Sequence, residues 1–208
     1  MSVARAGALM ASTPFAAFVG SAGHNEFSSG VPIPAAARVG DLSVICFIAS
    51  RTMSGGSGGG WSTFTTNNGQ VKVSWKQLEL ADLTVPLVLN ADAPVTVLVW
   101  RGPTKVSAQR TSGSGAAPSS PTVGGFTMMG FDKSLQTVGL VGFTLGINGS
   151  AELHSPPWQD GAAQGPTSFR QATYSMTTLS NYPDGAGINV TTGFGPGTGY
   201  AAVHELLA

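Results

Sequence analysis

The residues of this chain that could do chemistry are scattered, and the patterns around them are poor matches to known reactive sites. Ser57 lies in the run GGSGG at residues 55–59, which formally matches the GxSxG pattern of a serine nucleophile. That pattern needs a strained strand-to-helix turn that holds the serine beside an oxyanion hole. A glycine tract cannot hold it, so we interpret residues 54–60, SGGSGGG, as a flexible loop.

The histidines and loop carboxylates also lack the spacing that a reactive site needs. His24, His154 and His204 are widely separated, without the i, i+4 histidine or the CxxC companion of a zinc site. Asp160 and Asp184 could hydrolyse a glycosidic bond only if both were held at a defined separation, and their turn-rich surroundings favour solvated side chains. We therefore expect no catalytic residue, no metal and no cofactor.

One loop has the composition of a binding surface. The stretch 154–166, HSPPWQDGAAQGP, places Trp158 between a proline pair and polar residues, so its ring could form a rigid aromatic contact. The candidate contacts for a partner or a glycan are Trp158, His154, Gln159 and Asp160. A loop that is packed down by its tryptophan is the simpler interpretation. The glycine-rich run 193–199, GFGPGTG, lacks the features of a phosphate loop and predicts a tight hairpin.

Composition argues against several classes of partner. Charged residues make up 10% of the 208 residues, against roughly 25% in an average soluble domain. Ten basic side chains balance ten acidic ones, so we expect no electrostatic attraction to nucleic acid, to an anionic membrane or to acidic substrates. Low net charge with many small polar residues favours association. These features indicate a member of an assembly, with neither nucleic acid nor membrane as a partner.

The N-terminal stretch has no apolar region long enough for a signal peptide, and the chain has no candidate transmembrane span. Termini fray unless something holds them. We expect residues 1–12 to form an ordered arm that packs on a neighbouring subunit through Val3, Arg5, Leu9 and Met10. Residues 13–208 are then expected to form one domain, a length that all-β domains commonly reach.

The elements that must position any site are organised around residues 39–51, VGDLSVICFIASR. Only Ser43 interrupts an apolar run that is rich in β-branched and aromatic residues, and a glycine tract follows it. This pattern predicts a central β-strand that is buried on both faces. Cys46, the single cysteine, is then a small core residue, and no disulfide can form within the chain.

Short strands separated by glycine-rich turns account for most of the remaining chain. In residues 71–76 valine and tryptophan alternate with lysine and serine, which predicts a half-buried strand, and a change of phase predicts a β-bulge or strand bend near Lys76 and Gln77. Residues 111–121 and 148–167 are expected to be loops. The other predicted strands are 15–19, 85–90, 94–101, 137–147, 170–177, 188–192 and 200–207. Together they favour an all-β, single-domain sandwich of jelly-roll type.

Several short motifs follow one another in a recognisable order. They are GDL at 40–42, GW at 60–61, VSWK at 73–76, VTVLVWRG at 95–102 and SP at 120–121. This order, over residues 12–125, resembles a group of tailed-bacteriophage structural proteins described as minor tail or virion-associated proteins. The resemblance implies a jelly-roll-like virion component that is repeated by symmetry and has no catalytic role.

The sequence therefore favours a non-enzymatic structural component of a bacteriophage virion, assembled in the bacterial cytoplasm. A minor tail, tail-tip or head-fibre protein is the leading interpretation, with other virion proteins as partners. We expect the protein to be a homo-oligomer, with a trimer as the favoured state. A capsid decoration protein is one alternative. A lectin-like module that binds a host-surface glycan through the Trp158 loop is another, and a hydrolase using Asp160 or Asp184 is the least favoured.

Overall fold

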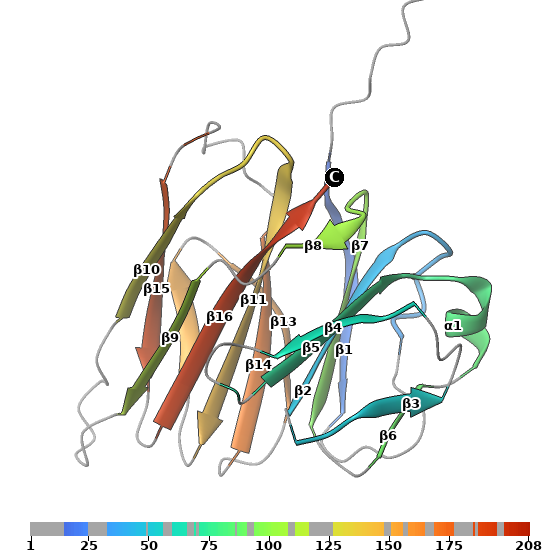
Figure 1. Ribbon diagram of the computed structural model, residues 1–208, viewed down its shortest axis with the longest axis horizontal. Coiled ribbons are helices and arrows are strands. Elements are labelled where there is room, and N and C mark those ends of the chain that lie inside the picture. The colour runs from blue at the N-terminus through green and yellow to red at the C-terminus, as the bar shows by residue number, and fades with distance from the viewer. Residues whose placement is uncertain are drawn as a thin grey trace, which may run out of the picture.

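The fold is built almost entirely from antiparallel β-strands, as the sequence predicts (Figure 1). The computed structural model describes residues 15–24, 33–48, 50–55, 60–65, 69, 71–85, 87–90, 94–107, 111–116, 127–147, 151–155, 158–164, 169–176, 185, 187–194 and 198–208. The predicted arm, residues 1–12, lies outside the described residues.

The first sheet has the strand order β1-β7-β2-β5-β4, with the central predicted strand in its middle. Its members are β1 (Ala17–His24), β7 (Val95–Arg101), β2 (Leu42–Ile48), β5 (Val71–Gln77) and β4 (Ser62–Thr65). One face of this sheet is covered by a ribbon of two short strands and by the helix α1. These are β3 (Met53–Gly55), β6 (Leu87–Leu89) and α1 (Leu80–Thr84).

The second sheet has the order β13-β14-β11-β16-β8, and β9 also pairs with β16. Its strands are β13 (Gln159–Gln164), β14 (Phe169–Met176), β11 (Thr137–Ile147), β16 (Thr198–Leu207), β8 (Lys105–Val106) and β9 (Thr111–Ala116). A third sheet of three strands completes the fold. It contains β10 (Thr127–Asp132), β15 (Gly187–Phe194) and β12 (Ala151–Ser155), with β15 in the centre.

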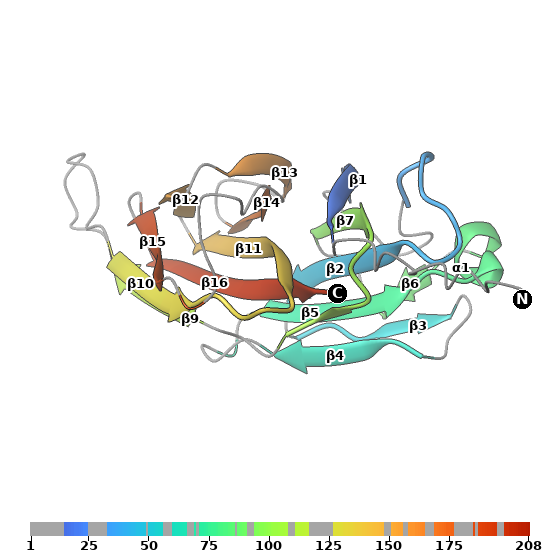
Figure 2. The ribbon, with the colours of Figure 1, turned by 90° about the horizontal axis from the view of Figure 1, so that it is seen from above.

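The first and second sheets pack face to face as a sandwich. Figure 2 shows them edge on, with β1 and β13 near one margin and β4 near the other. The core between them is formed by apolar side chains of both sheets: Leu42, Val44, Cys46, Val71, Val73, Leu98 and Trp100 of the first, and Val141, Phe143, Leu145 and Leu206 of the second. Burial of each large side chain contributes about 1.5–3 kcal/mol to this packing.

The central strand β2 is buried on both faces, as predicted. Val44 and Cys46 face the core between the sheets, whereas Ile45 and Phe47 pack with Leu78 under the helix side of the first sheet. Alternate side chains of a strand point to opposite faces, so a strand covered on both faces must be apolar at nearly every position. Burial raises the pKa of the Cys46 thiol well above its ordinary value, with a smaller opposing effect from a hydrogen bond to Thr96.

Two segments that were expected to be loops contain strands. Residues 111–116 form β9, which pairs with β16 from Thr111 opposite Val203 to Ala116 opposite Thr198. The expected loop 148–167 contains β12 and β13. The sequence TSGSGA of β9 has little intrinsic strand preference. It forms a strand because the neighbouring edge of β16 is available for pairing, and such context decides strand formation more than local propensity does.

Of the β-bulge or strand bend predicted near Lys76 and Gln77, the bulge is not formed. The pairing of β2 with β5 runs without a shift from Leu42 opposite Gln77 to Ile48 opposite Val71. The change of phase marks instead the end of β5 and the start of α1. Residues 195–197 of the hairpin predicted at 193–199 lie outside the described residues, and the strands on either side, β15 and β16, belong to different sheets. No helix in the described part of the chain is long and apolar enough to span a membrane.

Candidate functional site

The GDL and RG motifs contact each other through a bidentate ion pair between Asp41 and Arg101. Asp41 lies in the turn before β2, and Arg101 ends β7, which is the neighbouring strand. Nε of Arg101 donates to Oδ1 of Asp41 at 2.9 Å, and Nη2 donates to Oδ2 at 2.9 Å. The backbone N–H of Arg38 donates to the same carboxylate at 2.9 Å. These hydrogen bonds and the carboxylate charge raise the pKa of the Arg101 guanidinium.

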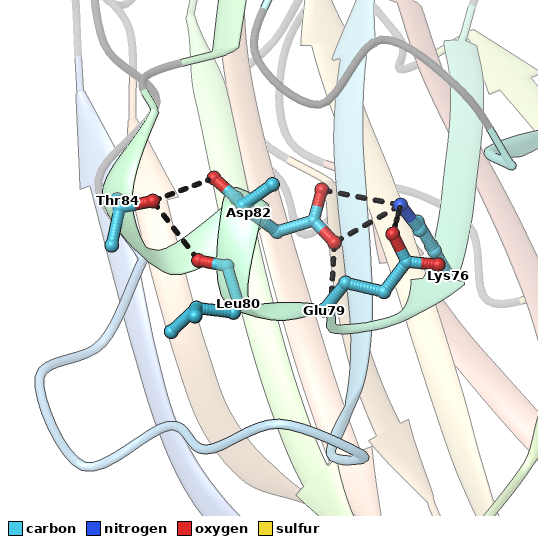
Figure 3. Close-up of polar contacts among 6 residues, drawn as sticks. Lys76, Glu79, Leu80, Asp82 and Thr84 are labelled. Carbon is cyan, nitrogen blue, oxygen red and sulfur yellow. Dashed lines mark hydrogen bonds and ion pairs between the residues drawn. The ribbon is translucent and has the colours of Figure 1, made fainter.

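Lys76, from the VSWK motif, is the centre of a second charged cluster. Its Nζ lies 3.1 Å from Oδ2 of Asp82 and 3.2 Å from Oε2 of Glu79 (Figure 3). The Lys76 side chain is only 6% exposed and that of Asp82 is fully buried, whereas the Glu79 side chain is 68% exposed. The sequence pattern had placed Lys76 on a solvated face, and this prediction is wrong. Its long side chain lies beneath α1 and is neutralised there.

The short helix α1 is fixed to the sheet by the same cluster. Oδ2 of Asp82 accepts a hydrogen bond of 2.8 Å from the backbone N–H of Glu79, which caps the helix. Burial disfavours the Lys76 ammonium, but the hydrogen bonds and charges of Asp82 and Glu79 outweigh it, so the pKa of Lys76 is raised. The amine is therefore held in its charged form, which is the opposite of what a lysine nucleophile requires.

The GW motif lies against this cluster. Gly60 has a φ of +79°, and a methyl group added to it would lie 3.2 Å from Cε of Lys76. Trp61 packs on the apolar cluster beneath α1. Four of the five motifs therefore form two spatial pairs, GDL with RG and GW with VSWK, while SP at 120–121 lies outside the described residues. The charged residues of the four, Asp41, Lys76 and Arg101, take part in ion pairs.

His204, Glu205 and Ser107 are of residue types that build nucleophilic sites, but their geometry does not. The His204 ring lies between Phe64, at 4.4 Å, and Phe143, at 5.9 Å between ring centroids. Its Nδ1 is 3.2 Å from the backbone oxygen of Ser107, not from the hydroxyl. The Ser107 hydroxyl instead accepts a hydrogen bond of 2.9 Å from the backbone N–H of Glu205. A serine nucleophile needs its hydroxyl on the base, whereas the contact shown here joins the ring to the backbone oxygen of Ser107.

Glu205 is fully buried, and the hydroxyl of Thr137 donates a hydrogen bond to its Oε1. The Thr137 hydroxyl also lies 2.7 Å from that of Ser134. The cluster connects the turn before β11 to the last strand. No motif or spacing predicted this cluster, although a histidine and a glutamate inside the apolar stretch YAAVHELL are a local signal for it.

Trp158, the predicted aromatic contact, is half-buried and packs inward. Its Cη2 and Cζ3 atoms lie 3.5 and 3.6 Å from the position that a Cβ atom on Gly142 would take. Cδ1 of Leu153 already occupies that position. Its ring meets Tyr174 edge-on at 6.3 Å, and its Nε1 is buried without a hydrogen-bond partner among the residues described. Because Gly142 of β11 has no side chain, it allows the close approach of these two side chains.

The other predicted contact residues belong to strands rather than to one loop. His154 lies in β12, and Gln159 and Asp160 begin β13, where they pair with Ser175 and Tyr174. His24 ends β1 opposite Val95. Val3, Arg5, Leu9, Met10, Ser57 and Asp184 lie outside the described residues.

Within the ranges given above, no group of three or more His, Cys, Asp or Glu side chains could hold a metal ion. No protein-family model, curated protein or solved structure matches the chain.

Proposed function

We propose that the protein is a non-enzymatic structural component of a bacteriophage virion, either a minor tail or tail-tip protein or a head-fibre protein. In this proposal residues 13–208 form a single jelly-roll-type sandwich and residues 1–12 form an arm that contacts a neighbouring subunit. The protein is a homo-oligomer, with a trimer as the favoured state, and its other partners are further virion proteins.

The observation that supports the proposal is the spatial pairing of the motifs. Asp41 of GDL binds Arg101 of the RG motif, and Gly60 of GW lies against Lys76 of VSWK. Motifs that contact one another in the fold depend on one another. Their shared order in the sequence therefore supports the resemblance to phage structural proteins more than unrelated motifs would. Their roles are to fix turns, strand ends and a helix, which fits a scaffold better than a catalyst.

The composition supports assembly as the mode of action. With 10% charged residues, the chain has little charge to keep copies apart. Repeated virion parts associate through symmetric contacts, and burial of uncharged surface supplies the free energy. The same features suit a capsid decoration protein, which is the alternative within this class.

Immunogold labelling of intact phage particles tests the location. Antibodies against the purified protein should label the tail tip or the head fibres. Label spread evenly over the capsid would replace the leading proposal by the decoration alternative. Absence of the protein from purified particles, checked by mass spectrometry of the same preparation, would overturn a virion role.

A further inference from the structure

The first sheet ends in an exposed strand with an open edge. β4 pairs with β5, and among the described strands it has no second neighbour. Ser62, Thr63 and Thr65 are exposed and Phe64 is half-buried. Figure 2 shows β4 along the lower margin of the molecule. An open edge presents a row of backbone N–H and C=O groups with which another strand can pair.

Several other edges of the described sheets are modified or covered. The pairing of β1 shifts register between Phe18 and Gly20, that of β13 between Asp160 and Ala163, and that of β12 between Leu153 and Ser155. β9 and β10, which end the second and third sheets, lie against each other. Bulges, charged side chains and prolines are the usual means of preventing edge pairing.

β4 has only four residues, and shortness also limits edge pairing, but the strand carries no bulge, charge or proline. Its pairing runs without a shift from Ser62 opposite Trp75 to Thr65 opposite Lys72, and its sequence STFT has neither charge nor proline. We propose that β4 pairs antiparallel with β4 of a second copy of this chain, which joins two five-stranded sheets into one. This inference rests on the proposed role in so far as that role is self-assembly.

Two-fold symmetry sets the register of this contact. The two-fold axis must run perpendicular to the sheet. Residues that lie directly opposite each other in the two copies then point to the same side of the sheet, and one residue lies opposite the same residue of the other copy. Thr63 is on the outer face, where its hydroxyl lies 2.7 Å from that of Ser74, whereas Phe64 faces the core against His204. With the axis at Thr63, each Ser62 lies opposite the Phe64 of the other copy, and the whole contact is made by described residues.

Charge and size explain why a second copy fits and why the contact is weak. No side chain of β4 is charged, so two copies meet without repulsion across the axis. A pair of four-residue strands buries less than the roughly 1,200–2,000 Å² of a stable interface. Isolated copies therefore associate weakly, and repetition within a particle strengthens the contact through effective concentration. In a trimeric assembly the contact would join one trimer to the next.

Sedimentation velocity over a concentration series tests the contact in the full chain. Thr63→Lys places two lysines directly opposite each other, with Cβ atoms about 5 Å apart, so the variant should self-associate about two- to fivefold more weakly than the unaltered chain. Thr104→Lys is the matched control, because Thr104 is an exposed threonine between β7 and β8. It should associate like the unaltered chain. Circular dichroism and the melting temperature report whether each variant folds.

Thr63→Cys provides a second test that keeps the fold. Mild oxidation should link two chains across the axis, and the native thiol of Cys46 does not interfere because it is fully buried. Two results would overturn the inference. One is that the unaltered chain stays monomeric and Thr63→Cys gives no cross-linked dimer. The other is that a folded Thr63→Lys variant associates as well as Thr104→Lys. If labelling still places the protein on the particle, assembly proceeds through other surfaces and only this inference fails.

Discussion

Arg101 binds Asp41 through two parallel hydrogen bonds of 2.9 Å across a sequence separation of 60 residues. The pair joins the turn before β2 to the end of β7, directly beside the cross-strand pair of Leu42 and Trp100. The carboxylate is nearly buried, with 4% of its side chain exposed, while the arginine side chain is 42% exposed. The aspartate is therefore the member of the pair that depends more on its partners.

Arg101→Ala should destabilise the protein more than Asp41→Ala. Removal of the arginine leaves a nearly buried carboxylate without its cation, and an uncompensated buried charge costs about 3–5 kcal/mol. Removal of the carboxylate leaves a guanidinium that water can reach and the backbone N–H of Arg38 without this acceptor, at a cost of about 1–3 kcal/mol for an orphaned polar group. Urea denaturation of both variants measures the free energies of unfolding. Equal losses, or a larger loss for Asp41→Ala, would contradict this account of the turn.

Lys76→Met should be among the most destabilising substitutions of a charged residue in this chain. It leaves the carboxylate of Asp82 fully buried without its cation, and the loss of one partner of a buried pair costs about 3–5 kcal/mol. The double variant Lys76→Met with Asp82→Leu should recover part of this loss, because no buried charge remains. A double-mutant cycle by chemical denaturation gives the coupling. A double variant less stable than Lys76→Met alone would show that the helix cap matters more than the charge.

The same pair should make stability sensitive to alkaline pH. The pKa of Lys76 is raised in the folded protein above its ordinary value of 10.5. A raised folded pKa stabilises the protein fully below the unfolded pKa, and this contribution is lost as the pH rises through the folded value. The stability difference between the unaltered chain and Lys76→Met should thus be constant from neutral pH to about pH 10 and shrink above it. Lys105→Met, at an exposed position, is the control. A difference that shrinks already below pH 9 would contradict the raised pKa.

Local patterning was sufficient to predict the core strands but not their charged contacts. The apolar run at 39–51 shows directly which element is buried on both faces, although β2 itself is shorter, at 42–48, while the strand predicted at 137–147 has the bounds of β11. The ion pair of Asp41 with Arg101 has no local signal, because the fold alone brings these residues together. Burial of Lys76 depends on Asp82, which lies in a helix of five residues that is too short to show a helical period.

The strand β9 shows why other elements could not be predicted. Its sequence TSGSGA reads as a loop because small residues with no apolar alternation give no periodic signal. The strand forms because β16 presents an edge there, and β16 is about eighty residues further along the chain. A similar limit applies to the Trp158 stretch, where proline and glycine obscured the short strands β12 and β13.

Gly142→Ala should destabilise the packing between β11 and the side chains above it. The added methyl group would overlap Cδ1 of Leu153 and touch the Trp158 ring, and overpacking of this kind costs about 1–3 kcal/mol. Leu153→Ala in the same chain should relieve the overlap, so the double variant should lose less than the sum of the two single losses. Thermal denaturation of the three variants decides this. Strict additivity would show that the glycine is not selected by this contact.

Trp158→Ala separates the packing role of this tryptophan from a role in binding sugar. The ring packs over Gly142 and against Tyr174, so its removal should cost about 2–3 kcal/mol, less than the upper range for a fully buried tryptophan. Because one edge of the ring and its Nε1 are turned into the protein, we expect glycan-array signals to be the same for the variant and the unaltered chain. Strong array binding by the unaltered chain that disappears in a folded Trp158→Ala variant would favour the lectin-like alternative. Loss of stability with an unchanged array makes Trp158 part of the scaffold.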